Sequence, residues 1–236
     1  MGYFELMGFG PKGWGLLLAQ ATLMTIAVSV TAFAIGAVLG GLLAWARLAG
    51  GRGIGIAAET YVTVLRGIPD LLVIYLLYFG GSSVLTSVMR WLGNDGFVGV
   101  NAFAAGAIAV GIISAAYQSE VYRGAFGAVA KGEIEAARAV GMGRMLMFRR
   151  ILAPQILRFA IPGLGNVWQL ALKESALISV VGLTEILRQA QVGAGSTRQP
   201  FVFFITAALL YLLLSTVSGW GFNRAEAAAM RGVRRA

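Results

Sequence analysis

The sequence predicts an all-α integral membrane protein with about five transmembrane helices. Hydrophobic residues make up 58% of the 236 positions and charged residues only 12%, which is far from the composition of a soluble globular protein. The charged residues are also grouped, so that several uncharged runs reach the roughly 20 residues that a helix needs to cross a bilayer. Because no internal repeat is evident, we expect one membrane domain covering residues 1–236.

The spans follow from these runs in chain order. The first run, residues 13–46, is longer than one crossing requires and predicts a tilted or extended helix. It has no basic start and no convincing cleavage site, so we expect it to be retained rather than removed as a signal peptide. The second span is interrupted by the sequence RGIPD, and the fourth carries the adjacent charges Lys173 and Glu174. The spans are expected at 16–46, 59–81, 97–122, 151–183 and 200–222.

Arginine and lysine residues fall mostly on one side of this arrangement. The N-terminus and the loops after the second and fourth spans hold Lys12, Arg90, Arg188 and Arg198. The opposite side holds Arg47, Arg52, Arg123, Lys131, Arg138, Arg144, Arg149, Arg150, Arg224, Arg231, Arg234 and Arg235. Positive residues resist translocation, which predicts an external N-terminus and a cytoplasmic C-terminus. Topology and attraction to anionic membrane lipid then account for the net charge of +9, and no nucleic-acid partner is expected.

The residue types that are missing exclude several kinds of chemistry. The chain has no histidine and no cysteine, which excludes serine-histidine and cysteine-histidine catalysis, ordinary zinc sites and histidine-ligated haem. The two aspartates, Asp70 and Asp95, lie near a helix break and in a loop, which does not suit an intramembrane aspartyl protease. A Walker-type GK[ST] loop is also absent. We therefore expect a non-enzymatic chain without metal or cofactor, and any ATP and Mg to be bound by another chain.

The loop at 123–150 is unusually polar for its apolar surroundings. Ile134, Ala137 and Val140 recur at helical spacing and predict a short amphipathic helix. Small side chains let such a helix lie deep in a groove of a partner protein. These small residues are Ala136, Ala137, Ala139 and Gly141. A solvated helix on the inner leaflet is the alternative that the pattern leaves open.

The ends of this helix are also marked in the sequence. Glu133 and Glu135 are expected in its first turn, where carboxylates complement the helix dipole. Gly141 and Gly143 are expected to end or kink it, because glycine adopts backbone conformations that other residues resist. Pro154 is expected to begin the next helix.

The spacing within this loop resembles a known family motif. Glu135-Ala136-Ala137, followed by Gly141, Ile151 and Pro154, resembles the EAA loop of ABC-importer permeases. Ala153 is a mild departure, since the family usually has leucine before the proline. Further stretches, including YVTVLRGIPDLLVIYLLYFG and IPGLGNVWQLALKESALISVVGL, resemble the polar amino acid branch, and most of all the Q-type permease of histidine, basic amino acid and opine importers.

The resemblance implies the type I ABC importer permease fold in a bacterial inner membrane, with the EAA helix as a cytoplasmic coupling element. It implies two copies of a cytoplasmic ATPase, an external substrate-binding protein and a second permease, with an M-type partner favoured over a homodimer. The substrate would be a polar amino acid, expected to be basic, or an opine. The residues expected to couple to the ATPase are Glu133, Glu135, Ala136, Ala137, Gly141, Arg144, Ile151 and Pro154.

Two polar interruptions of the spans are candidates for the substrate pathway. A broken helix at membrane depth, as RGIPD predicts, is tolerated where protein or a cavity satisfies its backbone, and such breaks recur at transport sites. The alternative is a kink at the membrane surface in which Arg66 pairs with Asp70. Lys173 and Glu174 are expected to face the pathway or a partner helix, or else to snorkel to an interface. The candidate pathway residues are Arg66, Pro69, Asp70, Asn166, Gln169, Lys173, Glu174 and Ser175.

Two further expectations concern substrate charge and helix packing. Many permeases of this branch carry an acidic residue after the asparagine that corresponds to Asn166, whereas this chain has Val167. We therefore expect the countercharge for a basic substrate to come from the partner permease, with this chain contributing mainly shape and hydrogen bonds. Gly36, Gly40 and Gly41 are expected to allow close helix packing.

Two other function classes are considered. A secondary transporter or channel works without an ATPase, but it should show coupling-ion carboxylates or an internal repeat, neither of which is evident. A membrane scaffold binds partners and transports nothing. Co-purification with an ATPase and ATP-dependent transport of an amino acid distinguish both from an importer subunit.

Overall fold

The computed structural model describes residues 3–11, 13–93 and 96–231, and all regular structure in these ranges is helical, as the sequence predicts. Lys12, Asp95, Arg234 and Arg235 lie outside the described residues. The α-helices are α1 (Tyr3–Leu6), α2 (Gly15–Ala49), α3 (Arg52–Gly67), α4 (Asp70–Tyr75), α5 (Gly81–Trp91), α6 (Ala102–Gly127), α7 (Lys131–Ala139), α8 (Arg144–Met147), α9 (Ala153–Glu174), α10 (Ile186–Thr197) and α11 (Pro200–Ala229). Two π-helical turns, η1 (Leu76–Gly80) and η2 (Phe148–Leu152), and one 3-10 helix, η3 (Ser175–Val181), continue neighbouring α-helices.

Four helical segments in the described ranges are long and apolar enough to cross a membrane. They are α2, the continuous segment Asp70–Trp91, α6 and α11. The segment at Asp70–Trp91 is shifted from the expected second span at 59–81, because the helix breaks before Asp70 rather than running through it. The expected fourth span at 151–183 corresponds mainly to α9. This helix is long enough to cross a membrane, but it is not among the four segments that are also apolar enough.

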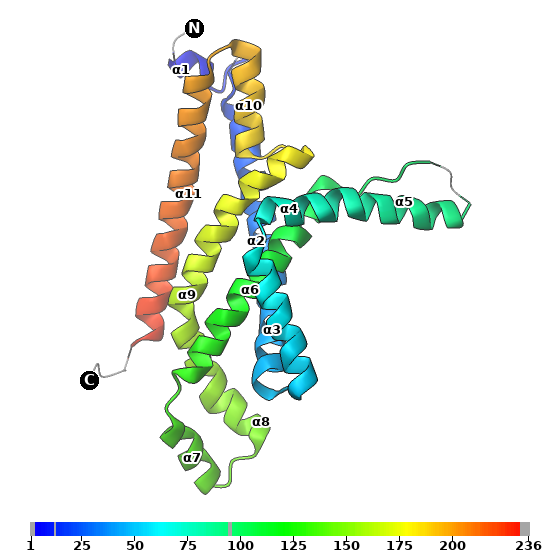
Figure 1. Cartoon of the computed structure of the whole chain (residues 1–236). Coiled ribbons are helices and arrows are strands. Elements are labelled where there is room, and N and C mark those ends of the chain that lie inside the picture. Colours follow the sequence, from blue (N-terminus) through cyan, green and yellow to red (C-terminus); the bar gives the residue numbers. More distant parts are fainter. Residues whose placement is uncertain (1–2, 12, 94–95, 232–236) are drawn as a thin grey trace.

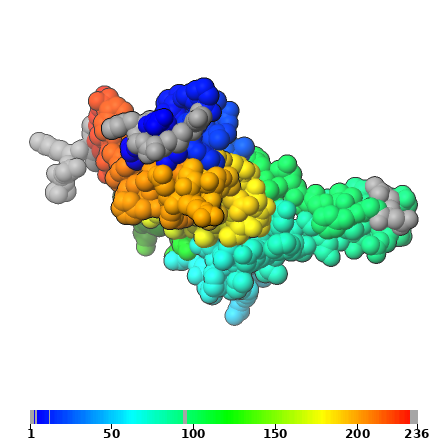
Figure 2. Space-filling view, turned by 90° about the horizontal axis from the view of Figure 1, so that it is seen from above, coloured from blue at the N-terminus to red at the C-terminus, as the bar shows by residue number. Residues whose placement is uncertain are grey.

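The helices form an elongated bundle with one lateral extension (Figure 1). α2, α6, α9 and α11 run along the length of the bundle, and α3 lies beside α6. α1 and α10 are at one end, and α7 and α8 are at the opposite end. α4 and α5 leave the bundle sideways, and the view from above shows the same arm standing clear of the body (Figure 2).

Two glycines allow α2 and α6 to pack closely, as expected. A Cβ atom on Gly36 would lie 2.6 Å from Nε2 of Gln118, and one on Gly40 would lie 2.9 Å from the backbone oxygen of Ala115. Gly41 has open space at the same position, so the expectation for it is wrong. Helices with small residues at a shared face approach one another closely, which accounts for the pairing of α2 with α6.

The break predicted at RGIPD is present and has a local cause. α3 ends at Gly67, and Ile68 and Pro69 both have extended backbone before α4 begins at Asp70. Proline disfavours helical backbone at the preceding residue and has no N–H to donate, so a helix cannot run through Ile68 and Pro69 without strain. Asp70 therefore stands in the first turn of a new helix.

Candidate functional site

The short helix predicted in the polar loop is present as α7, but it begins earlier than the sequence suggests. It starts at Lys131, so Glu133 lies in the first turn while Glu135 lies in the second. It ends at Ala139, and Gly141 follows with a φ of 76°, the left-handed conformation that glycine tolerates best. Pro154 lies in the first turn of α9 as expected, although α8 and η2 continue helical structure before it.

An apolar cluster, which we call the joint cluster, fixes α7 to the neighbouring helices. Ala137 of α7 is buried in it, whereas Val140 is 74% exposed and does not extend the apolar face as the spacing suggested. Glu133 adds a polar contact, since it accepts a hydrogen bond from the side chain of Gln155 in α9. The joint cluster consists of Val129, Ala137, Met147 and Leu152, with Phe126, Ile134, Met142, Ile151 and Ile156 partly buried around them.

The exposed surface of α7 and of the following turn combines small residues with charged ones, among them Lys131, Glu133 and Arg138. Glu135, Ala136, Ala139 and Gly141 are exposed, and so is Arg144 at the start of α8. Ala137 and Ile151 instead belong to the joint cluster, so they support the loop from within. The coupling candidates therefore fall into an exposed group and an internal group.

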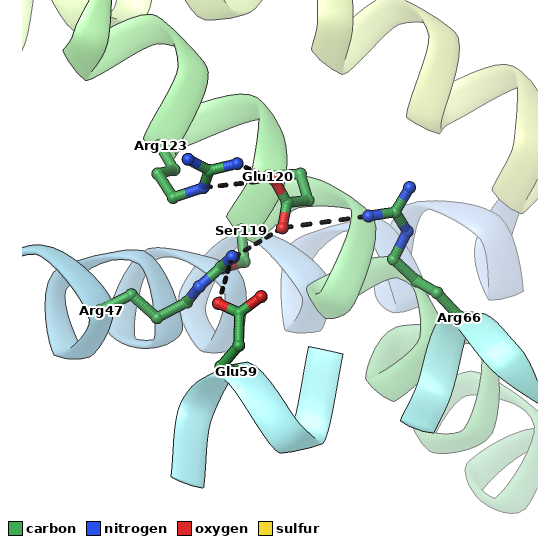
Figure 3. Close-up of polar contacts among 6 residues, drawn as sticks. All are labelled: Arg47, Glu59, Arg66, Ser119, Glu120 and Arg123. Atoms are coloured by element: carbon green, nitrogen blue, oxygen red, sulfur yellow. Dashed lines mark hydrogen bonds and ion pairs between the residues drawn. The ribbon is translucent and has the colours of Figure 1, made fainter. Parts of the chain in front are cut away.

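A second polar group, the charge network, joins three helices near the end of the bundle that carries α7 (Figures 1 and 3). Arg47 of α2 binds Glu59 of α3 at 2.6 Å and Glu120 of α6 at 2.8 Å. Glu120 also binds Arg123 at 2.7 Å and lies 3.9 Å from Arg66. The Arg47 side chain is only 6% exposed, so its pairing with these carboxylates avoids an uncompensated buried charge.

The charge network was not predicted from the sequence. In the sequence, Arg47 and Arg123 indicate only the topology, and no pattern assigns a role to Glu59 or Glu120. In the sequence these four residues are charges of opposite sign spread over separate helices. Arg47, Glu120 and Arg123 lie near the ends of apolar helices, which is the only hint of a shared role. Because Glu59 and Glu120 are far apart in the chain, their meeting at one arginine depends on tertiary structure.

The helix break and the end of α9 meet at a third polar group. Glu174 interacts electrostatically with Asp70, and Tyr117 of α6 interacts with both carboxylates and with Arg66. Glu174 is 5% exposed, and neither of its carboxylate oxygens has a hydrogen-bond partner. The neighbouring Lys173 is exposed, so the two adjacent charges occupy different environments as expected.

Arg66 does not form the surface pair with Asp70 that the alternative interpretation required. Its guanidinium lies 3.9 Å from Glu120 and stacks over the Tyr117 ring, with its central carbon 5.5 Å from the ring centroid. The break between Gly67 and Asp70 also removes the helical i and i+4 relation on which that pairing rested. Arg66 therefore connects the charge network to the surroundings of the helix break.

The remaining pathway candidates make other contacts or are exposed. Gln169 binds α11 through both ends of its amide, donating to the backbone oxygen of Ser215 at 2.9 Å and accepting from the Ser215 hydroxyl at 2.5 Å. Ser175 is buried and donates to the backbone oxygen of Leu172 at 2.7 Å. Pro69 and Asn166 are exposed. The side chains of Gln169 and Ser175 thus already have partners within the chain.

The whole arrangement combines an exposed helical loop, an apolar joint from this loop to a long helix, and polar groups between helices. Within the described ranges, no group of three or more acidic side chains is placed to hold a metal ion. Residues 32–229 match the family described as binding-protein-dependent transport system inner membrane component. The chain belongs to this family.

Curated members of the family resemble this permease over nearly its full length. It is 60% identical over 235 residues to the octopine transport system permease protein OccQ of Rhizobium meliloti, covering 100% of this chain and 99% of the relative. The nopaline transport system permease protein NocQ of Agrobacterium fabrum is 47% identical, with 97% and 98% covered. The histidine/lysine/arginine/ornithine transport system permease protein HisQ of Escherichia coli is 37% identical, with 95% and 98% covered.

Solved structures agree with the fold of this permease. A crystal structure of an amino acid ABC transporter with histidines matches with a TM-score of 0.78 and 30% identity, covering 91% of this chain and 95% of that chain. An inward-facing form of the MetNI methionine ABC transporter matches with a TM-score of 0.70 over 92% and 98% of the chains. Its identity of 21% supports the likeness of fold alone. The chain therefore has the type I importer fold and is a permease component of an inner membrane ABC transport system.

Proposed function

We propose that this permease is the Q-type subunit of an importer for basic amino acids or opines. The observation that carries the coupling role is the fixed connection from α7 to α9 through the joint cluster and the Glu133–Gln155 contact. Movement of α7 would be passed on to α9, because packed cores resist continuous deformation. An ATPase that binds the exposed side of α7 would therefore shift the helix that ends at Glu174.

The proposed partners are two copies of a cytoplasmic ATPase, an external substrate-binding protein and a second, M-type permease. The family description, which names binding-protein-dependent transport, supports the binding protein, and the likeness to a solved amino acid ABC transporter supports an ATPase. Burial supports the need for a second permease, since only α6 among the four candidate spans is buried over most of its apolar window. One chain therefore forms one wall of a pathway rather than enclosing it.

The proposed orientation places the N-terminus outside and α7 and the C-terminus in the cytoplasm. It is supported by the arginine distribution and by the position of α1 and α7 at opposite ends of the bundle (Figure 1). In this orientation the exposed surface of α7 faces the compartment that holds ATP. The proposed pathway residues lie further along the bundle, where α3, α4, α6 and α9 meet.

The test is reconstitution of the complex purified with the operon's own ATPase, permease and binding protein. We expect ATP-dependent uptake and substrate-stimulated ATP hydrolysis with arginine, lysine, histidine or an opine, and little with glutamate. Glutamine serves as the neutral comparison. Uptake that continues without ATP would contradict the importer assignment, and an active homodimer would contradict the M-type partner.

A further inference from the structure

The end of α9 contains a buried carboxylate that makes no ion pair with the described residues. Glu174 is 5% exposed, and both of its oxygens lack a hydrogen-bond partner. A buried carboxylate is retained at low cost only when a cation, a hydrogen-bond donor or a proton compensates it. Its partner must therefore come from outside the chain or be a proton.

A second carboxylate lies beside it. Asp70, in the first turn of α4, interacts electrostatically with Glu174, and the two side chains form what we call the carboxylate pair. Two carboxylates at close range repel unless a positive charge or a proton is shared between them. The pair sits where two broken helices meet, because α3 ends at Gly67 and α9 gives way to a 3-10 helix at Ser175.

The nearby cations of the chain do not fill this place. Lys173 is adjacent in sequence, but side chains of neighbouring helical residues point about 100° apart, and Lys173 is exposed. Arg66 approaches Glu120 and the Tyr117 ring instead. Among the described residues, neither Lys173 nor Arg66 has a nitrogen within 4.0 Å of either carboxylate.

We propose that the carboxylate pair of Asp70 and Glu174 binds the positively charged side chain of the transported substrate, a guanidinium or an alkylammonium group. This proposal rests on the proposed function and specifies the part of the substrate site that binds the cationic side chain. A guanidinium presents several N–H donors in a plane and can satisfy carboxylate oxygens in pairs. Tyr117, which interacts with both carboxylates, forms an aromatic wall for such a cation.

This assignment changes the division of roles that the sequence suggests. The sequence alone assigns the countercharge to the partner permease and hydrogen bonding to Asn166, Gln169 and Ser175 in this chain. The contacts show that Gln169 and Ser175 bind within the chain and Asn166 is exposed, while Glu174 makes no ion pair with the described residues. The chain itself therefore supplies negative charge to the pathway.

The test compares L-arginine with L-citrulline, in which a neutral ureido group replaces the guanidinium at similar length. Binding of both is measured by competition against radiolabelled arginine on the complete complex in lipid nanodiscs, without the binding protein. We expect the wild-type complex to prefer arginine by at least about 30-fold, since truncating one member of a buried charge pair typically costs that much affinity or more. Glu174→Gln and Asp70→Asn should bring the preference close to equality while leaving citrulline affinity within about threefold.

Two control variants and one labelling measurement on the wild-type complex distinguish loss of the carboxylate charge from general damage to the protein. Glu5→Gln, the same chemical change at an exposed carboxylate of α1, should keep the arginine preference. Glu174→Asp should retain most of it because it keeps the charge. In the wild type, a carbodiimide that labels buried carboxyl groups should modify Glu174, and arginine but not citrulline should protect it. A Glu174 that is modified equally with and without arginine would mean that a proton rather than the substrate compensates it, and would overturn the proposal.

The same experiment separates the two levels of inference. If the complex transports arginine with ATP but its preference over citrulline survives Glu174→Gln and Asp70→Asn, the subsite is wrong and the proposed function stands. If no amino acid is taken up with ATP, the proposed function fails. Equal affinity of the wild type for arginine and citrulline also overturns the subsite.

Discussion

Replacing Gly40 by alanine tests the contact between α2 and α6 against a control one residue away. The added Cβ at Gly40 would lie 2.9 Å from the backbone oxygen of Ala115 and 3.1 Å from the backbone nitrogen of Ser119. Backbone atoms cannot rotate away, so the helices must separate, at an overpacking cost of about 1–3 kcal/mol. Alanine in place of glycine contributes about 1 kcal/mol to helix stability, which leaves Gly40→Ala destabilising by roughly 0–2 kcal/mol.

Gly41→Ala makes the same chemical change where nothing lies within 4 Å of the new Cβ. It should therefore show only the helix-propensity gain of about 1 kcal/mol, so the two variants should differ by about 1–3 kcal/mol. For a chain of this size that corresponds to a difference of about 2–12 °C in Tm, with Gly40→Ala the lower. The assay is thermal unfolding of the detergent-solubilised complex. A Tm of Gly40→Ala equal to or above that of Gly41→Ala would refute the close contact.

Three further predictions concern coupling, the charge network and topology. Gly141→Asp or Glu135→Lys should abolish substrate-stimulated ATP hydrolysis without affecting membrane insertion, and wild-type stimulation in both would refute docking at α7. Glu120→Gln should lower stability by about 2 kcal/mol, because it removes charged hydrogen bonds to buried Arg47, and Glu59→Gln should cost less at a 58% exposed side chain. Thermal unfolding of the two variants compares them, and an equal loss would contradict the stated burial. A reporter fused after Arg231 should be active in the cytoplasm, and one in the loop after α5 outside; the reverse result would overturn the orientation.

Features with a local cause could be predicted from the sequence. The break before Asp70 follows from the backbone restrictions of Pro69 and Ile68, and the end of α7 follows from Gly141. The helical class follows from long uncharged runs, whose backbone groups must be satisfied within the segment in lipid. Close packing at Gly36 and Gly40 also has a readable pattern of small residues four positions apart.

Features that depend on distant contacts were missed or misplaced. The spacing of Ile134, Ala137 and Val140 predicts one continuous apolar face along α7. In the structure the chain turns at Gly141, and this turn leaves Val140 exposed. The direction of the α4–α5 arm depends on what packs beside it, which periodicity does not encode (Figure 2). The meeting of Glu59 and Glu120 at Arg47 requires three helices to be placed first.

The helices α8, η2 and α9 form one continuous helical segment from Arg144 to Glu174. The π-turn η2 interrupts its regular α-helical geometry between α8, which follows α7, and the end at Glu174. The N–H of Ala153 donates to the carbonyl of Phe148, five residues back, immediately before Pro154, which has no N–H to offer. Such a turn contains one residue more than the α-turn it replaces. Conversion of η2 to regular α-helix would screw one end of the helix against the other by about 100° and 1.5 Å, the increment of a single residue. The rotation of Glu174 about the helix axis relative to α7 therefore differs by the increment of one residue from that in an uninterrupted α-helix.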